Sequence, residues 1–448
     1  MSVCGSIFLN FFCFLSSIRG IYLLLYIIRK LSALCAGEDD RYTMSLIQLA
    51  DRMEHVHSDI RGELFHLANK MQREGTPVLK LNTGNPAAFG FPLPESIRNA
   101  IEGREHEAVA YCDFQGMPAA RDAIVRYEKS KGVQGIEPDD VFIGNGVSEV
   151  VNFALMPLLN PGDEVLIPTP SYSLWGNTVL LAGAKPVFYR CDEQSDWNPD
   201  IADLKKKITS RTRALVIINP NNPTGALYPT EVLEQMIEVA REHDLIVFSD
   251  EIYDRLVMDG LQHVSTAALA PDLTVITMNG LSKSHSLCGY RCGWMVISGP
   301  RAKTEEYRKG IVQLTSLRLC SNALAQLVIP AALDDMETPA AMIRPGGRLY
   351  EQRKATIETL DKIEGISYVK NVAAFYLFPK LDVKKFNITS DKQFARDLLM
   401  ETGILVVPGS GFDWAEPDHF RIVMLPQADE LRAAMERMGA FLDGYRQK

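Results

Sequence analysis

Lys283 lies in residues 279–294, NGLSKSHSLCGYRCGW, where small and hydroxyl-bearing residues surround a single lysine. Arg291 follows eight residues later, and the strand-like residues 274–278 come just before. A lysine amine attacks a carbonyl carbon only when it is neutral, and partial burial beside positive charge increases its neutral fraction. The pattern therefore favours an amine nucleophile at the end of a strand. A solvated loop lysine beside a structural arginine is the alternative.

A carboxylate follows the apolar residues of LIVFSD at 245–250. Asp250 stands where a buried carboxylate is rare, and such a group needs a partner. A protonated ring nitrogen of a cofactor would be one. Tyr253 would reach the same neighbourhood if the chain turns after Asp250. A helix N-cap is the other interpretation of Asp250.

Three further residues could complete a ligand site. Asn222 lies in NPNNPTG at 219–225, where two prolines stiffen the loop and its amide would be a fixed donor, although turn chemistry alone also explains the motif. Tyr172 could stack on a planar ring or pack in the core. Arg421 enters an apolar strand and would suit bidentate binding of a carboxylate. A surface strand arginine is the more usual explanation.

A possible phosphate cradle is the segment GNGVSE at 144–149, which follows a strand and opens a helix. Free backbone N–H groups there, with the Ser148 hydroxyl, could hold a phosphate. A single G-x-G is also typical of a plain tight turn. The chain has no GxxxxGK[ST] segment, so the sequence does not indicate a nucleoside triphosphate site.

The elements that must position these residues alternate between short apolar runs and helical patterns, which predicts an α/β fold with a mostly parallel, doubly wound sheet. Ligands bind such sheets at the carboxyl ends of the strands, where the polar motifs fall. From about residue 332 the pattern changes to that of a smaller α+β domain. The predicted strands are 141–144, 164–168, 186–190, 214–219, 245–249, 274–279 and 293–298, and the helical spacing of apolar residues predicts helices that include residues 45–75 and 230–243.

Composition excludes some functions. The chain has 448 residues and a net charge of −9, and an acidic protein is a poor partner for nucleic acid. Its eight cysteines are scattered and lack metal-ligand spacing, which indicates reduced thiols in a cytoplasmic protein and no metal site.

Residues 1–43 differ from the rest, because an apolar run at 7–28 is interrupted by Asn10, Arg19 and Gly20. A membrane anchor, a disordered extension and translated sequence upstream of a natural start at Met44 are all open. The third is favoured, since the sequence from Met44 onward is sufficient for a complete fold.

A lysine amine, a buried aspartate, a phosphate cradle, amide and phenol donors and a carboxylate-binding arginine together indicate pyridoxal 5'-phosphate acting on an amino acid. From residue 59 to the C-terminus the chain resembles the fold-type I, class I aminotransferases, and among them the bacterial glutamate–pyruvate (alanine) transaminases. The motifs that carry the resemblance are LNTGNPAAFGF, GNGVSE, NPNNPTG, SDEIYD, NGLSKSHSLCGYRCGWMV, PGGRLYEQR and PDHFRIVMLP.

The resemblance implies a role for each cofactor-binding residue. Lys283 would form a Schiff base with the cofactor and move the proton at the substrate Cα. Asp250 would pair with the ring nitrogen, Tyr253 and Asn222 with the ring hydroxyl oxygen, and Tyr172 would stack on the ring. The residues implied at the phosphate are Arg291, Val147, Ser148, Tyr111 from a neighbouring subunit, and Ser282. Many relatives have a phosphate-binding serine where this chain has Gly280, and Ser282 or Ser284 could replace it.

The resemblance also implies transamination between L-alanine and 2-oxoglutarate by a homodimer. Arg421 would bind the substrate α-carboxylate, with Gly84 and Asn222 lining that pocket. Arg61 and Arg318 are candidates for the distal carboxylate of glutamate. An aspartate or aromatic aminotransferase is the second reading, and a carbon–sulfur lyase or cyclising synthase of this scaffold is the third. The cofactor-sensing half of a transcription regulator is disfavoured, since residues 1–43 are too apolar for a DNA-binding domain.

The expected domain organisation places residues 44–88 with residues 331–448 in the smaller domain. Residues 89–330 would form the large cofactor-binding domain, and residues 1–43 would lie outside the fold.

Overall fold

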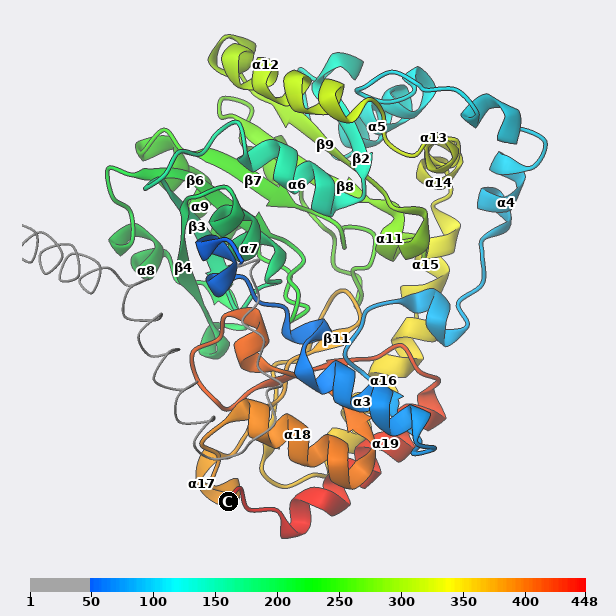
Figure 1. Ribbon diagram of the computed structural model, residues 1–448, viewed down its shortest axis with the longest axis vertical. Coiled ribbons are helices and arrows are strands. Elements are labelled where there is room, and N and C mark those ends of the chain that lie inside the picture. Colours follow the sequence, from blue (N-terminus) through cyan, green and yellow to red (C-terminus); the bar gives the residue numbers. More distant parts are fainter. Residues whose placement is uncertain (1–48) are drawn as a thin grey trace, which may run out of the picture. The chain divides into compact units, whose positions relative to one another are not determined.

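The fold is built on an eight-stranded sheet in which strands from separate βα units lie side by side (Figure 1). The structure, a computed structural model, describes residues 49–448, so the predictions for residues 1–43 lie outside the described part. In sheet order the strands are β2 (Val141–Asn145), β9 (Cys292–Ser298), β8 (Val275–Gly280), β7 (Ile246–Asp250), β6 (Thr212–Ile218), β3 (Glu164–Thr169), β4 (Lys185–Asp192) and β5 (Asn198–Pro199).

Most neighbouring strands of this sheet are parallel. The pairs β8–β7, β7–β6, β6–β3 and β3–β4 are parallel, whereas β9 is antiparallel to both of its neighbours and β5 is antiparallel to β4. The central strands are buried on both faces, which explains their continuous apolar runs. The predicted α/β class is confirmed, and all seven predicted strands occur with ends within two residues of those expected.

Helices cover the sheet and follow its strands in the chain (Figure 1). Among the predicted helices, residues 230–243 correspond to α9. The helices from residue 95 to residue 343 are α4 (Glu95–Ile101), α5 (Pro118–Ser130), α6 (Val147–Leu155), α7 (Leu174–Leu181), α8 (Ile201–Lys206), α9 (Thr230–Glu242), α10 (Thr266–Leu269), α11 (Leu281–Ser284), α12 (Arg301–Arg318), α13 (Ala323–Gln326), α14 (Ile329–Asp334) and α15 (Glu337–Ile343).

A second hydrophobic core joins the C-terminal segment to residues between 64 and 81. Its members include Leu81, Phe394 and Phe420. The helices there are α3 (Glu63–Arg73), α16 (Arg348–Leu360), α17 (Val383–Phe386), α18 (Asp391–Thr402) and α19 (Ala428–Gly444). The strands are β1 (Leu79–Lys80), β10 (Ile366–Ser367), β11 (Tyr376–Leu377), β12 (Lys380–Leu381), β13 (Ile404–Leu405), β14 (Val407–Pro408) and β15 (Phe420–Val423).

The N-terminal segment meets the C-terminal one through a parallel pairing of β1 with β13. Helix α3 also lies beside α18 (Figure 1). Residues 55–448 nevertheless form a single compact unit by their contacts. The division into a large domain of residues 89–330 and a small one of residues 44–88 and 331–448 therefore stays a prediction.

One predicted helix is shorter than expected. The helical spacing of residues 45–75 predicts a continuous helix, whereas the described part contains short 3₁₀ helices at Asp51–His55 and Asp59–Arg61 before α3 begins at Glu63. The reason lies in tertiary contacts of His57. Its backbone N–H donates to Asn177 Oδ1 (3.2 Å), and Asn177 Nδ2 donates to its carbonyl oxygen (2.6 Å). These bonds hold the backbone open where a helix would close it.

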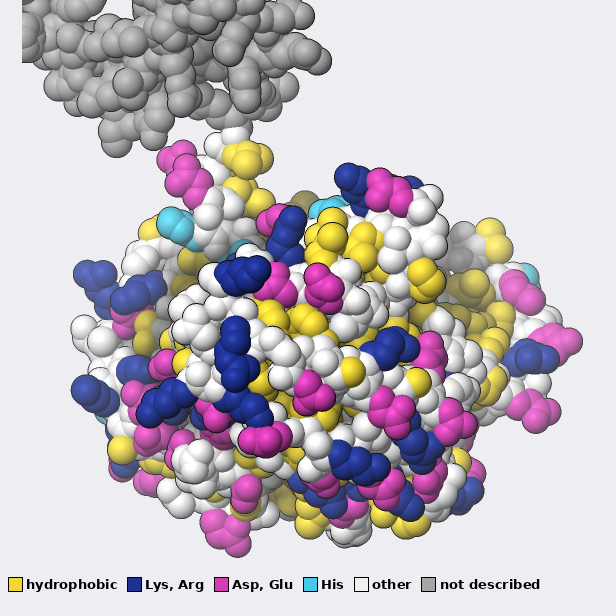
Figure 2. Space-filling model, turned by 90° about the horizontal axis from the view of Figure 1, so that it is seen from below, with side chains coloured by type: hydrophobic (Ala, Val, Ile, Leu, Met, Phe, Trp, Pro, Cys, Tyr) yellow, Lys and Arg dark blue, Asp and Glu magenta, His cyan; other side chains and the backbone are white. Residues whose placement is uncertain are grey.

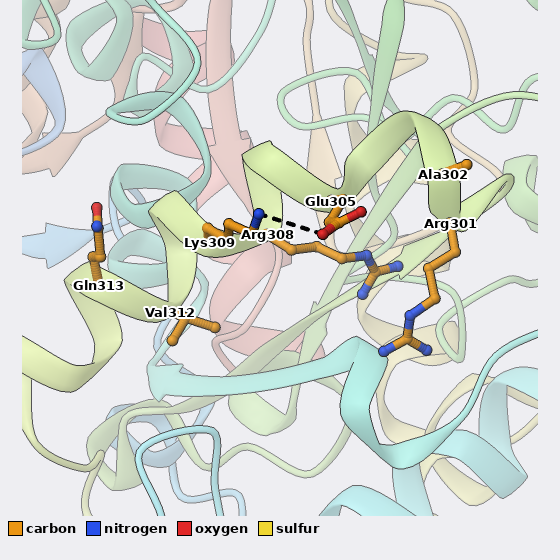
Figure 3. Close-up of a pocket in the computed structure, with 7 residues that line it drawn as sticks. All are labelled: Arg301, Ala302, Glu305, Arg308, Lys309, Val312 and Gln313. Atoms are coloured by element: carbon orange, nitrogen blue, oxygen red, sulfur yellow. Dashed lines mark ion pairs between the residues drawn. The ribbon is translucent and has the colours of Figure 1, made fainter.

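A cavity of about 660 Å³ lies along α12, where Glu305 pairs with Lys309 beside Arg301 and Arg308 (Figure 3). The face formed by the C-terminal helices mixes basic and acidic side chains (Figure 2). No helix among residues 49–448 is long and apolar enough to cross a membrane.

Candidate active site

Lys283 emerges directly from the end of a buried strand. Strand β8 ends at Gly280, and the single turn of α11 carries Lys283 in its third position. The Lys283 ammonium donates a hydrogen bond to the carbonyl oxygen of Gly84 (2.8 Å). Cys288 closes the loop after α11, since its thiol donates to the carbonyl oxygen of Ser282 (2.9 Å). The lysine side chain therefore points from the end of β8 towards the loop that carries Gly84.

The expectation that Lys283 is made more neutral by its surroundings is wrong for the protein alone. Burial lowers the pKa of the Lys283 ammonium, but Tyr376, Cys288 and Tyr172 raise it, and its pKa lies above the ordinary value. Arg421 acts in the opposite direction and is a smaller influence. In the free protein the group is thus a charged ammonium held by Gly84.

Asp250 is the last residue of β7, and its side chain is only 5% exposed. Trp175 Nε1 donates to Asp250 Oδ2 (3.1 Å), and the backbone N–H of Ile252 donates to Oδ1 (3.3 Å). Among the described residues no basic side chain forms an ion pair with this carboxylate. Burial therefore raises the pKa of Asp250 to about 6, from an ordinary value of 3.8. A cationic ring nitrogen would supply the missing partner.

Tyr253 lies beside a phenol that the sequence analysis did not single out. Its Oη is 2.9 Å from the Oη of Tyr376, and both rings are buried. Burial, and next the neighbouring Tyr376, raise the pKa of Tyr253 well above its ordinary value. The Tyr253 hydroxyl therefore stays protonated and can donate a hydrogen bond at neutral pH.

Arg421 is a fully buried cation whose guanidinium packs against two aromatic rings. It is 1% exposed, and its Cζ lies 4.7 Å from the ring centres of both Tyr376 and Phe412. Its Nη1 donates to Asn222 Oδ1 (3.0 Å) and its Nη2 to the carbonyl oxygen of Asn82, so the predicted pair of Asn222 and Arg421 is in direct contact. Burial lowers the pKa of Arg421 below its ordinary value. No carboxylate of the described residues pairs with it, so it can accept an anionic ligand.

The predicted phosphate cradle forms where α6 begins. Gly146 has φ 84°, which a side-chain-bearing residue rarely adopts, and an added Cβ would lie 2.4 Å from Arg291 Nη2. The Arg291 guanidinium therefore covers the N-terminus of α6, beside the free N–H groups of Val147 and Ser148. Gly293 on β9 leaves room for this turn, because a Cβ there would lie 2.5 Å from Val147 N. A helix N-terminus and a guanidinium together favour a phosphate.

The unusual Gly280 has a packing reason. A Cβ at this position would lie 2.6 Å from the carbonyl oxygen of Cys292 and 3.0 Å from the Cα of Gly293. A serine there would force β8 and β9 apart. Of the two serines that could replace it, Ser284 is buried with its hydroxyl 3.0 Å from His285 Nδ1, whereas Ser282 is only half-buried.

Four predicted residues lie at the margin of this group or outside it. Tyr172 is partly exposed at the loop before α7, and Tyr111 is 80% exposed. Arg61 is exposed and lines a separate cavity beside Asn82. Arg318 pairs with Glu149 and donates to the carbonyl oxygens of Phe114 (3.1 Å) and Ile143 (3.3 Å), so its guanidinium is already engaged in holding the fold.

A buried charge cluster lies next to the ends of β7 and β8. Lys131 Nζ is 2.9 Å from Glu128 Oε2, 2.8 Å from Glu251 Oε2 and 3.2 Å from Asp254 Oδ2. Asn279 Nδ2 donates to Asp254 Oδ2 (2.7 Å), which connects β8 to the cluster. Because one ammonium contacts all three carboxylates, the cluster ties α5 to the loop between Asp250 and Tyr253.

Sequence reasoning missed Trp175 and Tyr376. Trp175 lies three residues after Tyr172, at the start of α7. An indole N–H so close in sequence to a residue predicted to contact the cofactor could have been recognised as a further donor in the site. Tyr376 lies in a short strand whose neighbour in the sheet carries Arg421, and only that pairing reveals its place.

These residues fit pyridoxal 5'-phosphate. A buried carboxylate without a cationic partner suits the ring nitrogen, and the Gly146 turn beneath Arg291 suits the phosphate. The Lys283 amine and the Tyr253 hydroxyl are donors on the remaining sides.

Comparisons with known proteins agree with this fit. The sequence model of the family described as "Aminotransferase class I and II" matches residues 76–438. The chain belongs to this family.

Similar proteins that are named aminotransferases match this chain over nearly their whole length. A glutamate–pyruvate aminotransferase AlaA of Haemophilus influenzae is 48% identical over 404 residues, which is 90% of this chain and 100% of the relative. An alanine aminotransferase of Mycobacterium tuberculosis is 47% identical over 397 residues, which is 88% of this chain and 92% of the relative. A solved aminotransferase structure from Escherichia coli has a TM-score of 0.89 at 46% identity and covers 90% of this chain and 100% of that one.

The cofactor of this aminotransferase is pyridoxal 5'-phosphate. When bound, it supplies an electron sink that makes the Cα–H of an attached amino acid acidic. The protein's residues then decide which bond is aligned for cleavage and where the proton goes.

The pKa of Asp250 leads to a prediction for Asp250→Asn in the cofactor-free protein. A buried carboxylate with a raised pKa contributes stability only while it is protonated, so this contribution is lost as pH rises from about 4 to about 6. At pH 8 the variant should be more stable than the wild type by up to about 3 kcal/mol, and near pH 4 the two should be equal. Urea unfolding at both pH values measures this.

Adding the cofactor at pH 8 should reverse the order, because only the wild type gains an ion pair with the ring nitrogen. A cofactor-free variant that is less stable than the wild type at pH 8 would contradict the assignment of an unpaired, buried carboxylate.

Proposed function

We propose that this aminotransferase transfers the amino group between L-alanine and 2-oxoglutarate, giving pyruvate and L-glutamate. The observation that carries the substrate choice is that relatives 47–48% identical over 92–100% of their length are named glutamate–pyruvate or alanine aminotransferases. The geometry supports it, because one buried arginine for an α-carboxylate lies close to the lysine and the two faces of that arginine are covered by aromatic rings.

In this proposal Arg421 and Asn222 hold the substrate α-carboxylate, and Gly84 forms the adjacent wall. An α-carboxylate fixed in this way orients the Cα–H bond towards the Lys283 amine, which takes the proton from Cα and returns one later. Asp250 keeps the ring nitrogen protonated, and Tyr253 with Asn222 donates to the ring hydroxyl oxygen. The phosphate is bound by Arg291, Val147, Ser148 and Ser282, while Tyr172 covers the ring.

A glutamate side chain needs a second cation that does not exclude alanine. Arg61 is the candidate that the structure leaves free to serve, since Arg318 is engaged by Glu149. Arg61 lines a cavity of about 610 Å³ together with Lys80, Asn82 and Phe89, and the carbonyl of Asn82 accepts a hydrogen bond from Arg421. Asn82 Nδ2 also donates to the carbonyl oxygen of Ile60 (2.7 Å), next to Arg61 in the chain. From this place an exposed arginine could reach a distal carboxylate yet swing away from a methyl group.

We further propose a homodimer with shared sites. Several apolar side chains around η4 (Glu105–Ala108), α13 and the end of α12 are exposed. Gln326 of α13 donates to Cys112 Sγ (3.3 Å), which places the residues after η4 beside α13. These side chains, called here the apolar rim, are Val109, Tyr111, Leu317, Leu319 and Leu324. A second copy of the chain would cover them and bring Tyr111 to the phosphate of the neighbouring site.

The proposed place of action is the cytoplasm, which the free thiols of Cys112, Cys191, Cys288, Cys292 and Cys320 support. The proposed division of labour is a large domain that holds the cofactor and a small domain, of residues 44–88 and 331–448, that brings Arg421 to the substrate.

The central prediction concerns the visible absorbance of the purified, cofactor-loaded protein. L-Alanine should bleach the band of the lysine-bound cofactor, because the amino group moves to the cofactor, and 2-oxoglutarate should restore it. Lys283→Ala should abolish the cycle. If L-aspartate or an aromatic amino acid bleaches the band and alanine does not, the alternative substrate is correct. If L-cysteine is converted continuously to pyruvate, sulfide and ammonia without a 2-oxoacid acceptor, the enzyme is a carbon–sulfur lyase.

The Arg61→Ala variant should raise the KM for 2-oxoglutarate and L-glutamate by roughly tenfold or more, because a charged hydrogen bond to the distal carboxylate is lost. The KM for L-alanine and pyruvate should change less than twofold. Lys80→Ala, which removes another cation of the same cavity, is the matched control and should change neither. Equal losses for alanine and glutamate would remove Arg61 from this role.

The double variant Val109→Glu, Leu317→Glu should convert the dimer to a monomer, because it places like charges in the apolar rim where a second copy would bury them. Sedimentation equilibrium gives the mass. Met400→Glu, at an exposed apolar position on α18 outside the apolar rim, is the control and should remain dimeric. A wild-type protein that sediments as a monomer would reject the shared site.

A further inference from the structure

Tyr376 lies where the cofactor side and the substrate side of the site meet. Its strand β11 pairs with β15, so Tyr376 lies opposite Val423 and beside Arg421. Its Oη is 2.9 Å from Tyr253 Oη, and its ring centre is 4.7 Å from Arg421 Cζ. The hydroxyl also presses against Gly84, because a Cβ added there would lie 2.3 Å from Tyr376 Oη.

We propose that Tyr376 is a positioning residue: its hydroxyl donates to Tyr253 Oη and so directs the Tyr253 proton to the ring oxygen of the cofactor. The inference rests on the proposed function, in which Tyr253 donates to that oxygen.

The argument is a count of donors. A phenol has one hydrogen to donate and two sites that accept. In the Tyr253–Tyr376 pair, one hydroxyl must donate to the other. If Tyr253 donates to Tyr376, its only proton is used there. If Tyr376 donates, the Tyr253 proton is free for another acceptor.

A negatively charged ring oxygen selects the second arrangement. Hydrogen bonds to an ionised acceptor are about twice as strong as neutral ones, and a donor that itself accepts a hydrogen bond is polarised further. Both hydroxyls are buried, so water does not replace a missing donor cheaply. The pair thus forms a hydrogen-bond relay in which Tyr376 donates to Tyr253 and Tyr253 donates to the ring oxygen. The negative charge on that oxygen fixes this direction.

The ring of Tyr376 has a separate task. Together with Phe412 it holds the guanidinium of Arg421 between two aromatic faces, both 4.7 Å away. Phenylalanine at position 376 would keep this contact and lose only the hydroxyl. The Tyr376→Phe substitution therefore separates the relay from the support of Arg421.

The test is a pH titration of the visible absorbance of the holoenzyme. That absorbance follows the proton held next to the ring oxygen, and a weaker hydrogen bond from Tyr253 makes the oxygen more basic. Tyr376→Phe should therefore raise the midpoint by roughly half to one pH unit. Binding of an unreactive carboxylate such as acetate, measured on the same protein, should change less than twofold because Arg421 keeps its aromatic support.

A double-mutant cycle with Tyr253→Phe excludes a merely structural effect. If Tyr376 acts through Tyr253, the Tyr253→Phe variant should shift the midpoint further than Tyr376→Phe, and adding Tyr376→Phe to it should change nothing more. Tyr189→Phe is the matched control, since it removes a buried hydroxyl bonded to the carbonyl oxygen of Val216 (2.7 Å) outside the site, and should leave the midpoint unchanged.

The outcomes are distinct. An unshifted midpoint in Tyr376→Phe, or shifts that add in the double variant, would overturn the relay while the alanine-dependent bleaching of the wild type leaves the proposed function intact. A wild type without a cofactor band would overturn both.

Discussion

One ammonium among three buried carboxylates determines where the site residues lie. Lys131 contacts Glu128, Glu251 and Asp254. Glu251 and Asp254 lie on the loop that follows Asp250 and carries Tyr253. Removing one partner of a buried ion pair costs on the order of 3–5 kcal/mol, because the remaining charges lose their compensation. Glu251, Asp254 and His263 have atoms within 4.8 Å of one another, as metal ligands would, but the ammonium of Lys131 already fills the cationic position.

The contrast between Asp250 and its neighbours follows from this arrangement. Burial raises the pKa of Glu251 and Asp254, but Lys131 and His263 with the hydrogen bonds there together outweigh it, so both pKa values are lowered. Burial raises the pKa of Asp250 because its donors, Trp175 and Ile252, are neutral and do not offset it. Adjacent acids on one short loop thus take opposite electrostatic roles. Two are paired with cations in the fold, whereas the third has no cationic partner among residues 49–448.

Much of this could be predicted from sequence, for a physical reason. The strands are buried on both faces, so their apolar runs are long and unambiguous, and polar motifs directly after them must meet at one edge of a parallel sheet. Lys283, Asp250 and Asn222 were found in this way. Tyr376 was not, because its place depends on a two-residue strand pairing. The break near His57 was also missed, since the helical spacing there is opposed by a distant asparagine.

Gly84 and Tyr376 constrain each other's evolution. The phenol oxygen occupies the space that any side chain at position 84 would need, and the carbonyl of the same glycine receives the Lys283 ammonium. Neither position can drift alone: a larger residue at 84 is tolerated only with a smaller one at 376, which would also uncover a face of Arg421. In a set of related sequences, these two positions should therefore change together or not at all, although they lie 292 positions apart along the chain.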